Sequence, residues 1–205
     1  HLLSKRNKIP FIAECFDPII SSDWRRSKLS FRFNKWIESL ICQHAQAVVW
    51  YTHGAKNEAL NRNPDLGHRG HVIRPGMKPP NFNGIEYYKT EKIKFSYFGG
   101  LSRERSLFSI IKGINQLLVD KPEYSKIVEL GVYGGVLDQS SREFVKKNPC
   151  DFLKLYGRLE YDEVSNKSGR QQVLEKMRTS DVLILIHGIG QITKLYIPSK
   201  TYEYL

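Results

Sequence analysis

The amino-acid sequence predicts an α/β fold: a Rossmann-like parallel sheet with helices on both faces. From Lys92 onward, short β-rich runs alternate with segments of helical periodicity. Strands separated by helices of this length form parallel βαβ units. The run Val182–Ile186 is apolar throughout, which is typical of a strand that is covered on both faces of its sheet.

The second part of the chain contains most of the predicted elements. We expect strands at 93–98, 127–133, 152–156 and 181–186, and helices at 105–119, 139–147 and 169–179. The first of these helices is predicted from apolar residues at helical spacing, among them Leu107, Ile111 and Ile114. A last helix is expected to begin at Pro198, because proline is favoured in the first turn.

In the first part of the chain, the sequence predicts strands at 10–16, 47–51 and 71–73. A long helix between the first two carries an apolar stripe, made of Leu29, Phe33, Trp36, Ile37, Leu40 and Ile41. Turn residues concentrate at Pro75-Gly76, Pro79-Pro80 and Asn83-Gly84, which indicates a linker between about 76 and 92. We therefore expect two domains, at 1–80 and 81–205.

Length and composition exclude several classes of protein. The chain has 205 residues, of which 15 are glycine, 9 are proline and 12% are aromatic, which argues against collagen-like, low-complexity and disordered chains. Its longest apolar run is far shorter than the roughly 20 residues of a membrane-spanning helix. The three cysteines are too few for a disulfide framework, which favours a reducing compartment. The sequence has no initiator methionine and stops at Leu205, inside the predicted last helix. We therefore expect this chain to be a piece of a longer protein.

The net charge of +11 is distributed unevenly. Residues 1–90 carry 14 lysines and arginines against 7 acidic residues, and several of these basic residues surround one helix: Arg25, Arg26, Lys28, Arg32 and Lys35. One interpretation is a solvated basic face, and the other is an anionic partner, such as a lipid surface or a phosphorylated substrate. No motif of a nucleic-acid-binding fold accompanies the charge, so nucleic acid is not expected.

Polar and glycine residues follow three predicted strands, where ligands of open parallel sheets bind. Gly99 and Gly100 follow the first strand, and Arg105 comes shortly after them. Such a loop suits an anion, although two glycines after a strand also form an ordinary turn. Tyr156, Gly157 and Arg158 end another strand, where a turn with a solvent-facing arginine is the alternative.

The third of these strands, at 181–186, is followed by a loop with His187 and by the predicted last helix. Ser199 and Lys200 at the start of this helix suit a phosphate group. Glu203, one turn further on, could accept hydrogen bonds from vicinal sugar hydroxyls. His187 could approach the same ligand, and the alternative is a histidine in a solvent-exposed loop.

The last of these segments, from the strand at 181–186 through the predicted last helix, resembles the nucleotide-sugar-binding region of GT-B glycosyltransferases. The segments that carry the resemblance are Asp181–Ile186 and Ile197–Leu205. The sequence is most similar to family 4, the retaining group that includes many bacterial enzymes of surface-polysaccharide biosynthesis. The segments Phe98–Gly100, Val72–Gly76 and Phe16–Pro18 resemble further loops of that family.

The resemblance implies a GT-B architecture and a role for each candidate residue. Residues 81–205 would form the C-terminal donor-binding domain, and residues 1–80 would be part of the N-terminal, acceptor-side domain. The carried-over donor-binding residues are Gly99 and Gly100 at the diphosphate, Arg105 as its counter-charge, Tyr156, Gly157 and Arg158 around the nucleobase, Ser199 and Lys200 at phosphate, Glu203 at the ribose, and His187. Many members carry a second glutamate eight positions before the ribose-binding one, where this sequence has Leu195.

The resemblance also implies the chemistry and the partners. The reaction would transfer a sugar from a nucleotide-sugar donor to a saccharide or lipid-linked acceptor in the cytoplasm. The excess of basic residues in 1–90 adds a peripheral contact with an anionic membrane surface, at its inner face, as a further expectation. Stabilising a nucleoside diphosphate leaving group requires positive charge, which Arg105 and Lys200 could supply. The histidines and cysteines form no metal-ligand pattern, so neither a metal nor another cofactor is expected.

Three other functions remain open at the level of sequence. The chain could be a nucleotide-binding module without catalysis, or a basic protein that binds anionic polymers. A Rossmann-type oxidoreductase is less favoured, because the loop after Phe98 lacks the G-x-G-x-x-G spacing.

Overall fold

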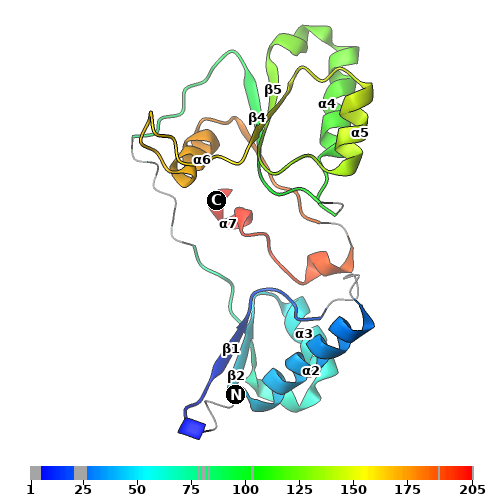
Figure 1. The fold of residues 1–205 in the computed structure, drawn as a ribbon, viewed down its shortest axis with the longest axis vertical. Coiled ribbons are helices and arrows are strands. Elements are labelled where there is room, and N and C mark those ends of the chain that lie inside the picture. Colours follow the sequence, from blue (N-terminus) through cyan, green and yellow to red (C-terminus); the bar gives the residue numbers. More distant parts are fainter. Residues whose placement is uncertain are drawn as a thin grey trace. The chain divides into compact units, whose positions relative to one another are not determined.

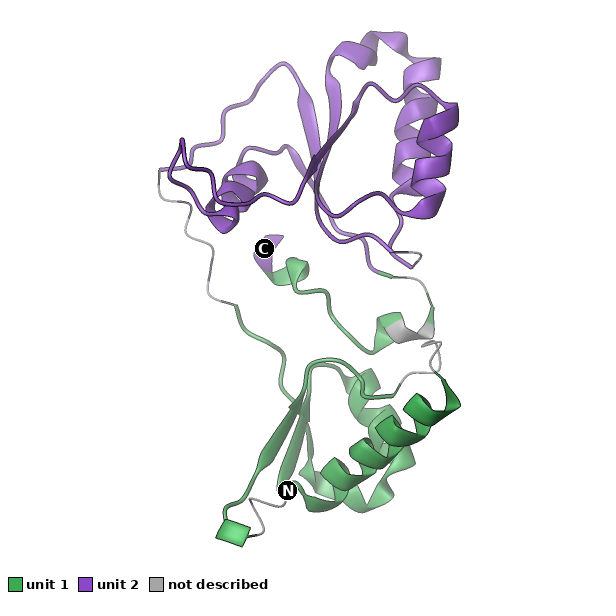
Figure 2. Cartoon of the chain, in the orientation of Figure 1, with its two compact units in different colours: residues 1–77, 188–202 green, residues 78–187, 203–205 purple. Residues whose placement is uncertain are grey.

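The computed structural model of the chain describes residues 6–20, 27–77, 79, 82, 84–102, 104–188 and 190–204, with the backbone alone at 191 and 192. Arg25, Arg26 and Leu205, named above, lie outside the described residues. The chain divides into two compact units, shown in Figure 2. Unit 1 comprises residues 1–77 and 188–202, and unit 2 comprises residues 78–187 and 203–205. The assignment of 1–80 and 81–205 to acceptor and donor domains stays a prediction.

The sheet of unit 1 consists of β1 (Ile12–Cys15), β2 (Ala47–Trp50) and β3 (Gly70–Val72). All pairs are parallel and the order is β1-β2-β3. Cys15 pairs with Trp50, and Trp50 pairs with Val72, so the strands end together at one edge. Each strand lies within one residue or two of its predicted position.

Helix α2 (Lys28–His44) and helix α3 (His53–Arg62) connect these strands, and a 3-10 turn, η1 (Pro64–Arg69), precedes β3. Helix α3 is absent from the sequence-based prediction. Its buried residues are two alanines, Ala55 and Ala59, which form a weak apolar pattern. The local signal that identifies it is Thr52, whose hydroxyl accepts a hydrogen bond from the backbone N–H of Ala55.

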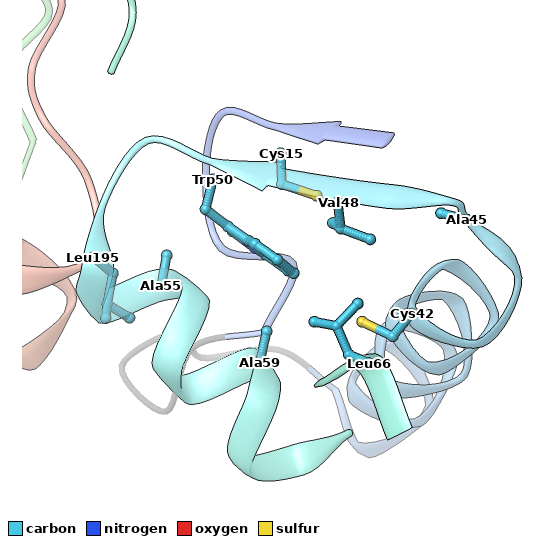
Figure 3. Close-up of a cluster of buried hydrophobic side chains, with 9 residues drawn as sticks. All are labelled: Cys15, Cys42, Ala45, Val48, Trp50, Ala55, Ala59, Leu66 and Leu195. Atoms are coloured by element: carbon cyan, nitrogen blue, oxygen red, sulfur yellow. The ribbon is translucent and has the colours of Figure 1, made fainter. Parts of the chain in front are cut away.

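The core of unit 1 includes a residue from far along the chain. Figure 3 shows Trp50 among small side chains of the helices, with Leu195 beside Ala55 at the start of α3. The Thr52 hydroxyl donates to the carbonyl oxygen of Leu195 at 2.9 Å. A Cβ on Gly54 would lie 2.5 Å from the carbonyl oxygen of Lys194, so only glycine permits this approach. The segment with η3 (Gln191–Lys194) is therefore packed against the first turn of α3.

The sheet of unit 2 consists of β4 (Ile93–Gly99), β5 (Val128–Gly134), β6 (Leu153–Gly157) and β7 (Val182–Ile184). All pairs are parallel in the order β6-β5-β4-β7. Figure 1 labels the two central strands, β4 and β5. Strand β7 is shorter than the predicted 181–186 and pairs, within the described residues, with β4 alone. Val182 and Leu185 are exposed, so the apolar run is not covered throughout.

The helices of unit 2 among its described residues are α4 (Phe108–Asp120), α5 (Gln139–Lys147), α6 (Gly169–Arg178) and the end of α7 (Lys200–Tyr204). A 3-10 turn, η2 (Pro122–Lys126), follows α4. Helix α7 begins two residues after the predicted start. The carbonyl oxygens of Pro198 and Ser199 accept from the N–H groups of Thr201 and Tyr202, as in a turn that leads into a helix.

Alternate residues of the central strands of unit 2 pack on opposite faces of the sheet. Tyr97 and Leu130 pack with side chains of α4 and α5, whereas Phe98 and Tyr133 pack with α6 and α7. The predicted fold class, an α/β Rossmann-like fold with parallel sheets and flanking helices, is confirmed.

Candidate functional site

Three neighbouring strands of unit 2 end at glycines in the left-handed half of backbone space. Their φ angles are 141° at Gly99, 130° at Gly134 and 66° at Gly157. Gly99 pairs with Gly134, and Tyr133 pairs with Gly157, so all three glycines lie at the carboxyl edge of the sheet. Because side chains are rarely compatible with these angles, the backbone at this edge stays bare.

Two glycine pairs contact each other at this edge. The N–H of Gly135 donates to the carbonyl oxygen of Gly99 at 3.3 Å, and a Cβ on Gly134 would lie 2.6 Å from the same oxygen. Sequence reasoning identified Gly99 and Gly100 but missed Gly134 and Gly135. The available signal was a repeat, since an aromatic residue followed by two glycines closes both strands.

The aromatic residues that precede these glycines form a stack across three strands. The ring centroids of Phe98 and Tyr133 are 4.7 Å apart, and those of Tyr133 and Tyr156 are 4.6 Å apart, with nearly parallel planes. Burial raises the pKa of the Tyr133 hydroxyl, and the neighbouring Tyr156 adds to the rise. The ring of Tyr133 folds back over Gly131, so the stack lies on the sheet face and not beyond its edge. The Tyr156 ring belongs to this stack, whereas its successor Gly157 is at the edge.

The loop after β4 places an exposed cation next to the bare backbone. Arg105 is exposed, and its backbone N–H and carbonyl both bond to Ser102, which closes the loop. Burial raises the pKa of Tyr97, and the positive charge of Arg105 opposes the rise. The Tyr97 hydroxyl donates to the carbonyl oxygen of Gly100 at 2.9 Å. Gly99, Gly100 and Arg105 therefore lie at the end of β4 and in the closed loop that follows it, and their role in ligand binding stays a prediction.

A buried carboxylate that sequence reasoning missed connects the loops after β4 and β5. Asp138 accepts hydrogen bonds from the hydroxyls of Ser106 and Ser141, at 2.8 and 2.6 Å, and from the backbone N–H groups of Leu107 and Ser141, both at 3.1 Å. Burial alone would raise the pKa of Asp138, but these hydrogen bonds outweigh it and hold the pKa below its ordinary value. Asp138 thereby fixes the residues that directly follow Arg105 and caps helix α5.

The loop after β6 packs against the start of α6. A Cβ on Gly169 would overlap the carbonyl oxygen of Leu159, and the Gln172 amide donates to the carbonyl oxygen of Glu160. Arg158, between Gly157 and this contact, is exposed. The predicted nucleobase loop is thus fixed to the first turn of α6.

Glu203, in α7, contacts the first turn of α6 through an ion pair. Its Oε2 accepts from Nη1 of Arg170 at 2.9 Å, while its side chain is only 9% exposed. Tyr204, the next residue, packs with Phe98 and Met177 on the α6 face of the sheet. The structure therefore places Glu203 and the β6 loop around the start of α6, within unit 2.

The remaining predicted residues are less tightly associated with this edge. His187 is exposed, three residues beyond the end of β7. Ser199 and Lys200 belong to unit 1 by their contacts. Leu195, which stands where many family 4 enzymes have a second glutamate, is buried in the core of unit 1.

Within the described part of the chain, no group of three or more His, Cys, Asp or Glu residues is placed to hold a metal ion. Of the helices in these same residues, none is both long and apolar enough to cross a membrane.

Solved structures align with this chain. TarM aligns with a TM-score of 0.54 and 14% identity, over 88% of this chain and 32% of TarM. A single-residue mutant of S. aureus TarM, in complex with fondaparinux, alpha-GlcNAc-glycerol and UDP, aligns with a TM-score of 0.55 and 14% identity, over 86% of this chain and 32% of the other. Anabaena Alr3699/HepE, in complex with UDP-glucose, aligns with a TM-score of 0.49 and 12% identity, over 87% and 47% of the two chains.

The chain thus spans about a third of the length of TarM. No protein-family model matches the chain, and no curated protein matches it. At 14% identity, the likeness to TarM establishes the fold: two parallel sheets with flanking helices.

Proposed function

We propose that this chain is the donor-binding part, with an adjoining acceptor-side part, of a retaining GT-B glycosyltransferase of the family 4 type. It transfers a sugar from a nucleotide-sugar donor to an acceptor hydroxyl. The observation that carries the proposal is the bare carboxyl edge of unit 2, where Gly99, Gly134 and Gly157 end adjacent strands beside the exposed Arg105. The fold shared with TarM, whose mutant binds UDP in its solved complex, supports it.

In this proposal the diphosphate lies along the bare backbone of the glycine pairs. Backbone N–H groups and the Arg105 guanidinium offset its charge, which increases as the leaving group departs. Lys200 adds a second cation and Ser199 a hydroxyl, while His187 approaches the phosphate or sugar. The acceptor hydroxyl attacks from the face that the diphosphate leaves, and the departing phosphate takes its proton, so that the sugar configuration is retained.

The nucleoside occupies the space around the start of α6. Gly157 and Arg158, with Tyr156 before them, border the nucleobase, and the Glu203 carboxylate accepts hydrogen bonds from the ribose hydroxyls. Because Glu203 is paired with Arg170, a ribose would share or replace that ion pair.

The acceptor is a saccharide or a lipid-linked saccharide, and the pathway is bacterial polysaccharide or glycolipid biosynthesis on the cytoplasmic side of the membrane. The excess of basic residues in 1–90 and the saccharide ligands in the TarM complex support an acceptor of this kind. The nucleotide-sugar is a substrate, and we propose that no metal takes part. Transfer should then be unchanged when a chelator is added.

Calorimetric titration with UDP, GDP and ADP tests the donor site. Arg105→Ala should weaken binding of the matching nucleotide roughly tenfold, because a charge-assisted contact with phosphate is lost. Arg142→Ala, an exposed arginine of α5, is the matched control and should bind as the parent does.

The matched control for a change at Glu203 is a change at its ion-pair partner, Arg170. Glu203→Ala should weaken nucleotide binding, whereas Arg170→Ala breaks the same pair but leaves the carboxylate for the ribose. If Arg105→Ala and Glu203→Ala both bind like the parent, the site is wrongly assigned. A full-length protein that binds the nucleotide but transfers no sugar would be a binding module instead.

A further inference from the structure

Helix α2 exposes an apolar strip on the side opposite its buried face. Leu29, Phe33 and Trp36 are 79%, 58% and 56% exposed, and their spacing of four and three residues places them on one face. The buried residues of the helix, Glu38 and Cys42, lie on the other side and face the core of unit 1. The stripe predicted from periodicity therefore exists, but much of it faces outward.

A row of basic residues flanks this strip, roughly a quarter of a turn away around the helix. Lys28, Arg32 and Lys35 each precede one of the three apolar residues by one position, and all three are exposed. The only acidic residue of the helix is Glu38, which is buried and paired with Arg62 at 2.8 Å. The exposed surface of α2 thus combines apolar side chains with positive charge alone.

We propose that this face of α2, made of the strip and the basic row, docks onto a membrane surface that contains anionic lipids. Phenylalanine and tryptophan on a helix face insert at the boundary between headgroups and acyl chains, while lysine and arginine bind anionic headgroups. A second copy of the chain is disfavoured, because the charged groups exposed on this face are all positive, so two copies would offer each other no ion pair. The inference extends the lipid-linked acceptor of the proposed function.

Co-sedimentation with vesicles tests the proposal. The protein should sediment with vesicles that contain phosphatidylglycerol and remain in solution with phosphatidylcholine alone. Phe33→Ser combined with Trp36→Ser should weaken binding roughly tenfold, because less apolar area leaves water. Arg32→Glu combined with Lys35→Glu should weaken it at least as much and reduce its salt dependence.

Matched controls lie in unit 2. Lys146→Glu with Lys147→Glu changes two exposed lysines of α5, and Val164→Ser changes a fully exposed apolar side chain. Both should bind vesicles as the parent does, and thermal unfolding should show all variants to be folded.

Three results would overturn the inference: no sedimentation of the parent with anionic vesicles, unchanged binding of the α2 variants, or a parent dimer that the Phe33 and Trp36 changes convert to monomer. Nucleotide titration of the same samples separates the two proposals. Vesicle binding without nucleotide binding would refute the donor site alone, and the reverse result would refute the α2 surface alone.

Discussion

The two sheets of the molecule share a parallel βαβ topology but differ in how their strands end. In unit 2, three strands end at glycines with positive φ, so their carboxyl edge is bare backbone. In unit 1, aromatic residues follow β1 and β2, and the rings of Phe16 and Tyr51 are in edge-to-face contact at 5.1 Å. Backbone without side chains lets an anion approach N–H groups closely. The same topology therefore produces a candidate anion site in unit 2 and a side-chain-covered edge in unit 1.

The two units also differ in what their buried carboxylates connect. Glu38 joins helices α2 and α3 through Arg62, the last residue of α3. Asp138 joins the two loops at the carboxyl edge of unit 2. The comparison indicates that Glu38 serves stability only, whereas Asp138 serves both stability and the geometry of the candidate site.

Glu38→Ala should have the largest effect on stability. The Glu38 side chain is 3% exposed and bonds Nε and Nη2 of Arg62 at 2.8 and 3.0 Å. Breaking a buried pair from one side costs about 3–5 kcal/mol. Denaturant unfolding should show this loss, while Glu58→Ala, which removes the more exposed partner of Arg62, should cost below about 1 kcal/mol. Equal losses in the two variants would contradict the assignment.

Asp138→Asn should have the second-largest effect on stability, and it should also weaken nucleotide binding. Four donors converge on the carboxylate, and an amide would turn an N–H₂ group toward two of them. We expect a loss of about 1–3 kcal/mol in unfolding free energy and weaker nucleotide binding. Ser141→Ala, which removes one donor, should cost less and leave nucleotide binding nearly unchanged. Full nucleotide affinity in Asp138→Asn would separate this residue from the site.

The pH dependence of the same residue has a definite sign. The pKa of Asp138 is lower in the folded protein than its ordinary value, so folding favours the ionised form. Its contribution to stability is complete above the unfolded carboxyl pKa, about 3.9, and is lost as pH falls through the folded pKa. The stability difference between the parent and Asp138→Asn should therefore shrink in acid, and a difference that grows would contradict the argument.

Gly134→Ala tests the contact of the two glycine pairs. A side chain at φ 130° is strained, and its Cβ would lie 2.6 Å from the Gly99 carbonyl oxygen. We expect a cost of about 1–3 kcal/mol and weaker nucleotide binding, because the Gly99 turn must shift. Gly100→Ala is the control for stability, since a Cβ there meets nothing within 4 Å. Similar thermal unfolding of the two variants would argue against the contact.

Tyr156→Leu should have the smallest effect. Its ring ends the aromatic stack and is partly exposed, so losing the contact with Tyr133 should cost about 0.5–1.5 kcal/mol. Lys154→Leu, a neighbouring exposed position of β6, controls for the change of an edge strand. Nucleotide titration of Tyr156→Leu shows whether the ring or only the adjacent backbone borders the nucleobase: a large loss of affinity would favour the ring.

Much of the fold was predictable because its signals are local. Strands such as β4 and β5 follow from short β-rich runs, and α5 and α6 follow from helical periodicity. Helix α3 was missed because its buried side consists of alanines, whose apolar pattern is weak. The exposure of Val182 and Leu185 was missed because an apolar run does not reveal which elements pack on the two faces of its sheet.

The candidate site was predictable only in part. Gly99, Gly100 and Arg105 are close in sequence, so their proximity follows from one loop. Asp138 was not identified, because a single aspartate before a helix looks like a cap, and its other partners, Ser106 and Leu107, lie more than 30 residues earlier. Arg170 was missed for the same reason, since its ion-pair partner is 33 residues away.

The sequence by itself determined the class of fold, the order of most elements and the positions where strands end, because periodicity and turn residues act over a few neighbouring positions. Only the tertiary structure decided which glycine turns meet, which loops Asp138 joins and which face of α2 is buried. On α2, a buried Glu38 takes the inner side since Arg62, from another helix, neutralises it. Such choices depend on contacts between residues distant in sequence, and no local pattern contains them.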